Sequence, residues 1–120
     1  MNKFDLEERL ISFSVLIVEI VDGISSTKAG KHLAGQLVRS GTSVSLNYGE
    51  AQSAESKKDF IHKMKIILKE LRETFICLKI IHRTGNYQEI SKMEQAQKEN
   101  NELISIFVKS IETAQKNLKS

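Results

Sequence analysis

The sequence contains no proline and no tryptophan, and cysteine occurs only once in its 120 residues. Because proline disrupts helix interiors and is common in turns, its absence favours long uninterrupted helices over a β-rich fold. The single cysteine, Cys77, cannot form an intramolecular disulfide, which indicates a reducing compartment. With 40% hydrophobic residues, the chain 1–120 is expected to form one domain with a single core.

Signals for export or membrane insertion are also lacking. The N-terminal stretch is acidic, whereas a signal peptide begins with basic residues. The longest early apolar run, residues 15–18, ends at Glu19 and is too short to span a bilayer. We therefore expect a cytoplasmic protein that does not enter a membrane.

Residues 55–83 predict the central helix of the chain. Ser56 followed by Asp59 is a capping-box pattern at its start, and Gly85 fits a left-handed stop after its end. A helix of about 40 Å needs partners to bury its apolar side. That side is formed by side chains spaced three and four apart: Phe60, Met64, Ile67, Leu68, Leu71, Phe75, Leu78 and His82.

The opposite side of this helix is basic. Residues 55–83 contain eight Lys/Arg and four Asp/Glu, a net charge of +4, whereas residues 4–24 contain one Arg and five acids, a net charge of −4. This polarity fits either a polyanionic ligand or pairing between the two segments, within or between subunits; helix surfaces that are simply solvated are the third interpretation. We call the following residues the basic face: Lys58, His62, Lys65, Lys69, Arg72, Lys79 and Arg83.

A first helix is predicted over about residues 6–23, with Asp5 as its N-cap and Glu8 as the capping-box partner. Its inward row is Leu6, Leu10, Phe13, Ile17, Ile20 and Ile24.

This first helix has a second apolar row on its far side. A monomer of this size cannot easily bury both rows, so we interpret the second as an oligomer contact. Two isoleucines outside the inward row of the central helix are assigned to the same contact. The predicted interface residues are Ile11, Val15, Val18, Ile66 and Ile80.

Two further helices are predicted, over about residues 28–52 and 89–118. The first of these begins after a Thr27 N-cap. Its small inward residues indicate close packing against a neighbour, with a kink near Gly41 as the alternative. Its inward row is Gly30, Leu33, Leu37, Gly41, Val44, Tyr48 and Ala51.

The last helix has a polar first half, including Asn100, which is expected to pack least firmly. Its inward row is Met93, Leu103, Ile104, Phe107, Val108, Ile111, Ala114 and Leu118. Four long helices joined by short loops predict an all-α, antiparallel up-down-up-down four-helix bundle.

No group of residues predicts catalysis, a metal or a cofactor. A di-metal bundle needs Glu-x-x-His-type pairs from several helices, and only Asp59 and His62 have that spacing. Residues 28–31 lack the glycine spacing, the Ser/Thr and the preceding strand of a phosphate loop. Cys77 has no paired histidine. We therefore expect a protein that is not an enzyme.

Nucleic-acid binding is the remaining chemistry. Lys65, Lys69 and Arg72 place positive charge on successive turns, a spacing suited to phosphates. We therefore expect structured RNA or DNA to be bound through its backbone and shape, without sequence readout. A protein-binding scaffold with no nucleic-acid ligand is the alternative. Base stacking is not expected, because four phenylalanines fall on inward rows: Phe13, Phe60, Phe75 and Phe107.

Several segments resemble a known family. They are residues 29–50 (AGKHLAGQLVRSGTSVSLNYGE), 56–61 (SKKDFI) and 68–74 (LKELRET). They resemble the bacterial four-helix-bundle proteins encoded in intervening sequences of 23S rRNA genes, the S23-like proteins. That family includes the accessory protein of diversity-generating retroelements. The likeness covers essentially the whole chain.

The resemblance implies a helical bundle that assembles as a homopentamer. The retroelement members present a basic surface to nucleic acid and to a reverse transcriptase, so these partners are implied as well. Arg39, Asn47 and Glu50 match the most specific part of the motif. By helical phase they lie off the inward row or at its margin, which suits interface or helix-pairing roles better than catalysis.

Overall fold

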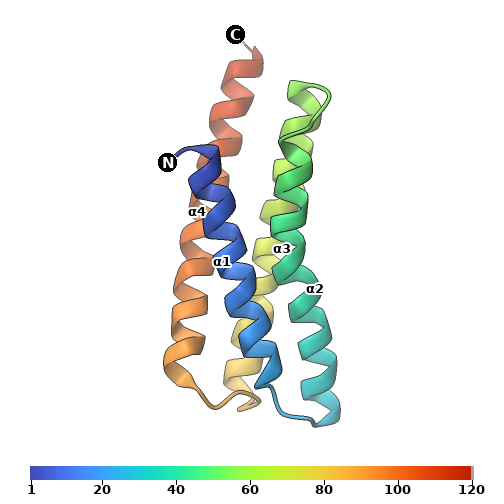
Figure 1. Ribbon diagram of the computed structural model, residues 1–120, viewed down its shortest axis with the longest axis vertical. Coiled ribbons are helices and arrows are strands. Elements are labelled where there is room, and N and C mark those ends of the chain that lie inside the picture. Colours follow the sequence, from blue (N-terminus) through green and yellow to red (C-terminus); the bar gives the residue numbers. More distant parts are fainter. Residues whose placement is uncertain (120) are drawn as a thin grey trace.

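The computed structural model describes residues 1–119, and side chains through residue 118. It contains four helices, α1 (Lys3–Asp22), α2 (Lys28–Ala51), α3 (Lys57–Arg83) and α4 (Ile90–Lys119). They run alternately up and down along a molecule with principal extents of 51 × 22 × 21 Å (Figure 1). The predicted all-α four-helix bundle is therefore confirmed.

The arrangement of the helices separates α1 from α3. Each helix packs against its neighbours in sequence, and α1 also packs against α4. Among the described residues, no contact joins either diagonal pair, α1 with α3 or α2 with α4. The α2–α3 turn and the end of α4 extend past the start of α1 (Figure 1).

Side-chain caps begin α2 and α3 as predicted. The Thr27 hydroxyl accepts a hydrogen bond from the Gly30 N–H at 3.0 Å, and the Ser56 hydroxyl accepts one from the Asp59 N–H at 3.0 Å. Past the end of α3, Gly85 adopts the left-handed conformation with φ of +69°.

The predicted start of α1 is wrong. Asn2, not Asp5, is the N-cap, and its side-chain oxygen accepts from the Asp5 N–H at 3.0 Å. Asp5 therefore lies in the first helical turn. Asparagine and aspartate cap about equally well, so local sequence alone did not distinguish the two positions.

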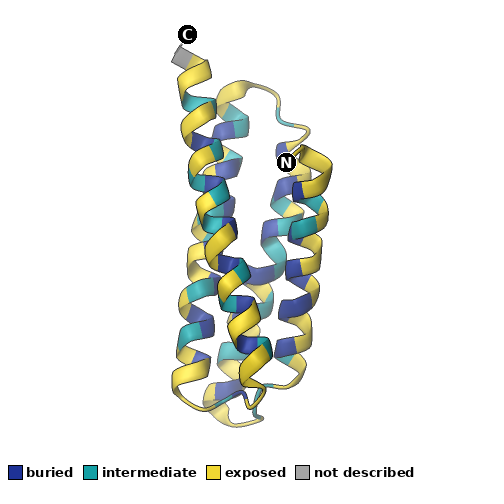
Figure 2. Ribbon diagram, turned by 90° about the vertical axis from the view of Figure 1, so that its left-hand side faces the viewer, coloured by how far each residue is buried: buried dark blue, intermediate teal, exposed yellow. Residues whose placement is uncertain are grey.

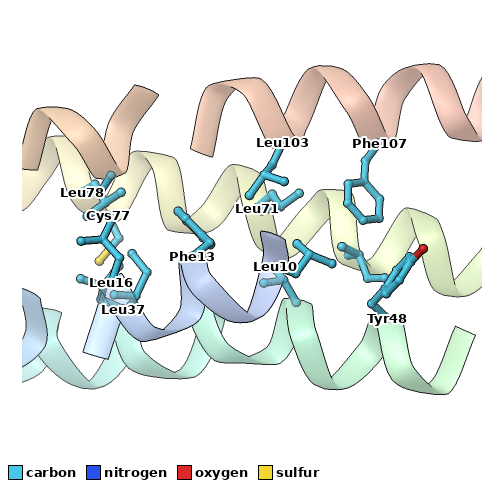
Figure 3. Close-up of a cluster of buried hydrophobic side chains, with 14 of the residues drawn as sticks. Leu10, Phe13, Leu16, Leu37, Tyr48, Leu71, Cys77, Leu78, Leu103 and Phe107 are labelled. Atoms are coloured by element: carbon cyan, nitrogen blue, oxygen red, sulfur yellow. The ribbon is translucent and has the colours of Figure 1, made fainter. Parts of the chain in front are cut away.

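Buried side chains from all four helices form the core, and Figure 2 shows them along the inward side of each helix. Ile17, Leu37, Leu71 and Phe107 are completely buried. The rings of Tyr48 and Phe107 meet edge-on, with centroids 6.0 Å apart (Figure 3).

The predicted inward row of α3 is correct in its middle and wrong at its end. His82 is exposed, and Ile81 is buried in its place. A straight-helix row drifts by about 20° per heptad against a 3.5-residue repeat, so it leaves the buried side over a long helix. The observed positions follow the heptad spacing of packed bundles: Met64, Ile67, Leu71, Thr74, Leu78 and Ile81.

The inward row of α4 differs from the prediction at its C-terminal end and in its polar half. Leu118 is 40% exposed, because α4 extends past the start of α1. In the polar half, Asn100 is completely buried at a heptad position between Ala96 and Leu103. Its side-chain nitrogen and oxygen have no hydrogen-bond partner among the described residues. Part of this half therefore belongs to the core.

Small residues join α1 to α2, in agreement with the predicted close packing. The Ser14 hydroxyl donates to the Gly41 carbonyl at 2.9 Å and lies 2.7 Å from the Ser45 hydroxyl. Helix α2 continues through Gly41 as one helix.

Candidate functional site

The basic face lies on the outer side of α3. Six of its seven residues are exposed, and Lys79 is half-buried with its Nζ 4.3 Å from the centroid of the Phe75 ring. Heptad packing places the inward row of α3 against α2 and α4, so the cations between those positions point outward. Six of the seven are thus exposed on the side that helical phase predicts, while their function is not tested by this geometry.

The cations of the basic face are unpaired. None of them forms an ion pair with any side chain that the structure describes, whereas several cations elsewhere do. Arg9, for example, contacts Glu99 at 2.7 Å and Glu102 at 3.4 Å. The positive charge along α3 is thus available to a partner outside the protomer.

A groove runs between α2 and α3 beside the middle of the basic face. We call it the α2–α3 groove; its volume is about 740 Å³. Apolar side chains alternate in it with charged ones, so it suits a ligand with both apolar and anionic groups. Its lining includes Leu33, Lys65, Leu68, Lys69, Arg72, Ile76 and Ile80.

Cys77 also lines this groove but is not set up as a nucleophile. It is 8% exposed, and its Sγ lies 3.6 Å from the Leu33 carbonyl, a weak S–H hydrogen bond. Burial raises the pKa of the thiol above its ordinary value, which reduces the thiolate fraction at neutral pH. Of a nucleophile and a structural thiol, the burial favours the structural thiol.

The outer face of α1 is apolar, as predicted. Ile11, Val15 and Val18 are 42%, 54% and 41% exposed. We call these three residues the outer face of α1. Phe4, two turns before Ile11, is also exposed on this helix. Phe4 was not among the predicted interface residues, although its seven-residue spacing from Ile11 indicates the same side of the helix.

The two remaining predicted interface residues, Ile66 and Ile80, lie on α3 and differ in exposure. Ile80 is 44% exposed and lines the α2–α3 groove, whereas Ile66 is half-buried. Ile76 is 54% exposed in the same groove. The apolar surface available on α3 is therefore centred on Ile76 and Ile80.

Two further kinds of site find no support. No group of three or more His, Cys, Asp or Glu residues that could hold a metal ion occurs in the described part of the chain. Across residues 1–119, no helix is long and apolar enough to cross a bilayer.

Comparison with known proteins identifies the family. The sequence model of the family described as 23S rRNA-intervening sequence protein matches residues 3–109. The chain belongs to this family. Among curated proteins, no significant match is found.

A similar crystal structure supports the assignment to the 23S rRNA-intervening sequence family. It is the crystal structure of a protein of unknown function from the S23 ribosomal protein family of Bacteroides thetaiotaomicron VPI-5482. The two chains are 28% identical with a TM-score of 0.83, over 93% of this chain and 99% of that one. The predicted resemblance and fold are confirmed, and no biochemical activity comes with them.

Within the motif that suggested the 23S rRNA-intervening sequence family, Arg39 joins two helices. From α2 it contacts Glu70 at 3.1 Å and Glu73 at 2.8 Å, both on α3. The hydrogen bond to Glu73 is the main cause that raises the pKa of the guanidinium. Asn47 is half-buried and Glu50 is exposed. Of the two roles predicted for Arg39, the contacts match helix pairing.

Proposed function

We propose that this member of the family is a non-enzymatic protein that binds structured RNA or DNA through the basic face of α3. The observation that carries the proposal is the row of exposed cations without acidic partners on their own protomer. Lys65, Lys69 and Arg72 follow one another at intervals of about 5 Å along the helix axis. Phosphates neutralised by such cations release counterions, which drives binding.

The proposed recognition does not depend on base sequence. No phenylalanine on α3 is fully exposed, since Phe60 and Phe75 are both partly buried. The one largely exposed phenylalanine, Phe4, is on α1, which α3 does not contact. Lysine and arginine contacts to phosphates position a duplex without reading its bases.

We further propose that the protein is a homo-oligomer, and the family resemblance implies a pentamer. The specific observation in favour is the exposed apolar outer face of α1. Contiguous apolar surface on a small protein marks an interaction site. A self-assembling scaffold with no nucleic-acid ligand is the second candidate, and exposed Ile76 and Ile80 beside the cations favour it.

The test is a charge reversal on the basic face with a matched control. Lys65→Glu/Lys69→Glu changes the net charge by as much as Lys98→Glu/Lys109→Glu, which alters two exposed lysines on α4. Affinity for a short duplex DNA is measured at several salt concentrations. Each lost phosphate contact should lower the slope of log affinity against log salt by about 0.9.

The α3 double variant should therefore lose about 1.8 units of slope, while the α4 variant retains the wild-type slope. Circular dichroism confirms that both variants remain helical. Equal weakening by the two variants would mean that net charge alone matters. Absence of wild-type binding at low salt would reject the nucleic-acid proposal and leave the scaffold.

A further inference from the structure

We propose that the outer face of α1 of one copy docks into the α2–α3 groove of a second copy, and that this contact competes with polyanion binding. The docking stands on its own observations. The competition rests on the proposed function of the basic face, because the two would share Lys65, Lys69 and Arg72.

The opposite charges of α1 and α3 cannot neutralise each other inside one protomer. The two helices lie at opposite corners of the bundle and make no contact within the described residues. Glu8 and Glu19 on α1 are exposed and form no ion pair with any described side chain. Attraction between these helices can therefore be satisfied only between copies.

The two surfaces also match in the spacing of their charges and apolar residues. On α1, Glu8 and Glu19 bracket the apolar outer face, and they are about 16 Å apart along the helix. On α3, Arg72 and Arg83 bracket Ile76 and Ile80 at the same interval, also about 16 Å. Each surface thus has an apolar centre between two like charges, with opposite signs on the two helices. The acid in the groove, Glu73, is paired with Arg39.

The charges also favour contact between unlike surfaces over a two-fold contact between like ones. A two-fold contact of α1 with α1 would bring acids against acids, and one of α3 with α3 would bring cations against cations. Like charges facing each other are costly at an interface. The cross contact avoids both, and it is heterologous, so a pair of copies still has one free outer face of α1 and one free α2–α3 groove. Repetition of such a contact forms a ring or a filament.

Docking would cover part of the basic face. Lys65, Lys69 and Arg72 line the groove that the α1 of the second copy would occupy, whereas Lys58 does not line it. An acidic helix seated there neutralises the same cations that a phosphate backbone would use. Self-association and polyanion binding therefore exclude each other at the middle of α3.

The docking is tested by exchanging the charges. Glu8→Lys/Glu19→Lys should weaken self-association at least about tenfold in sedimentation equilibrium, and so should Arg72→Glu/Arg83→Glu. A chain with all four substitutions has the wild-type net charge and opposite signs restored across the contact. It should recover most of the wild-type mass.

A wild-type protein that stays a 13.6 kDa monomer at micromolar concentration overturns the docking. So does a fourfold variant that remains as dissociated as the double variants.

The competition is tested with a short RNA hairpin and two variants that add the same charge to the protein. Val15→Lys lies in the outer face of α1, and Ser105→Lys is at an exposed position of α4, outside both docking surfaces. Val15→Lys should be monomeric and bind the hairpin several-fold more tightly than Ser105→Lys, which stays associated. Equal or weaker binding by Val15→Lys overturns the competition. If neither variant binds the hairpin, the proposed function fails and the competition with it, while the mass measurements still decide the docking.

Discussion

A β-carbon placed on Gly41 of α2 would lie only 2.7 Å from Cγ2 of Ile17 on α1. The side chain of Ile17 is completely buried and therefore has little room to move away. At this point the two helices approach so closely that glycine is required. The close approach also allows the Ser14 hydroxyl to reach the Gly41 carbonyl.

Gly41→Ala should therefore destabilise the protein by about 1–3 kcal/mol, because the new methyl group overpacks the α1–α2 contact. Gly35→Ala on the same helix is the control. No atom lies within 4 Å of a β-carbon placed there. This substitution should stabilise the helix by about 0.5–1 kcal/mol. Urea denaturation at one protein concentration measures both; a stabilising Gly41→Ala would show that the helices can separate at no cost.

Leu71 lies at the centre of the buried heptad positions of α3 and is completely buried. Leu71→Ala should lower the free energy of unfolding by about 2–5 kcal/mol, from lost burial and the cavity left behind. Ile76→Ala, on the exposed side of the same helix, should change it by less than about 0.5 kcal/mol in the monomer. Comparable losses for the two variants would contradict the packing described for α3.

Replacing Asn100 by an apolar residue should stabilise the fold, in contrast to the other core substitutions. Its amide is fully buried without a hydrogen-bond partner among the described residues, a state that costs about 1–3 kcal/mol. Asn100→Leu should raise the free energy of unfolding by about 1–2 kcal/mol. Asn101→Leu, at the exposed neighbouring position, should leave it within about 0.5 kcal/mol. Thermal unfolding distinguishes them, and a destabilised Asn100→Leu would indicate that the amide is satisfied in solution.

The raised pKa of Cys77 predicts a slow, pH-dependent thiol reaction. Because burial disfavours the thiolate, alkylation by iodoacetamide at pH 8 should be about tenfold or more slower in the folded protein than in urea. The same shift predicts that the thiol stabilises the fold below its ordinary pKa of 9.0, and that this contribution is lost as pH rises through the raised value. Cys77→Ala should flatten the alkaline loss of stability. Mass spectrometry follows the alkylation, and equal rates in both states would refute the burial.

The number and approximate ends of the helices followed from sequence alone. Thr27, Ser56 and Gly85 are local signals, and each acts within a few residues of the helix end that it marks. The inward rows of α1 and α2 and the exposure of the basic face followed as well, because helical periodicity separates apolar from charged residues.

Only the tertiary structure decided what depends on neighbouring helices. The heptad packing of α3 buries Ile81 and exposes His82, and the burial of Asn100 depends on the helices around α4. The partners of Arg39 lie on another helix. Most consequential is the diagonal placement of α1 and α3, which leaves their opposite charges apart. Periodicity specifies which side of each helix is apolar, but a helix does not encode which neighbour covers that side. That choice is made by side-chain packing among all four helices.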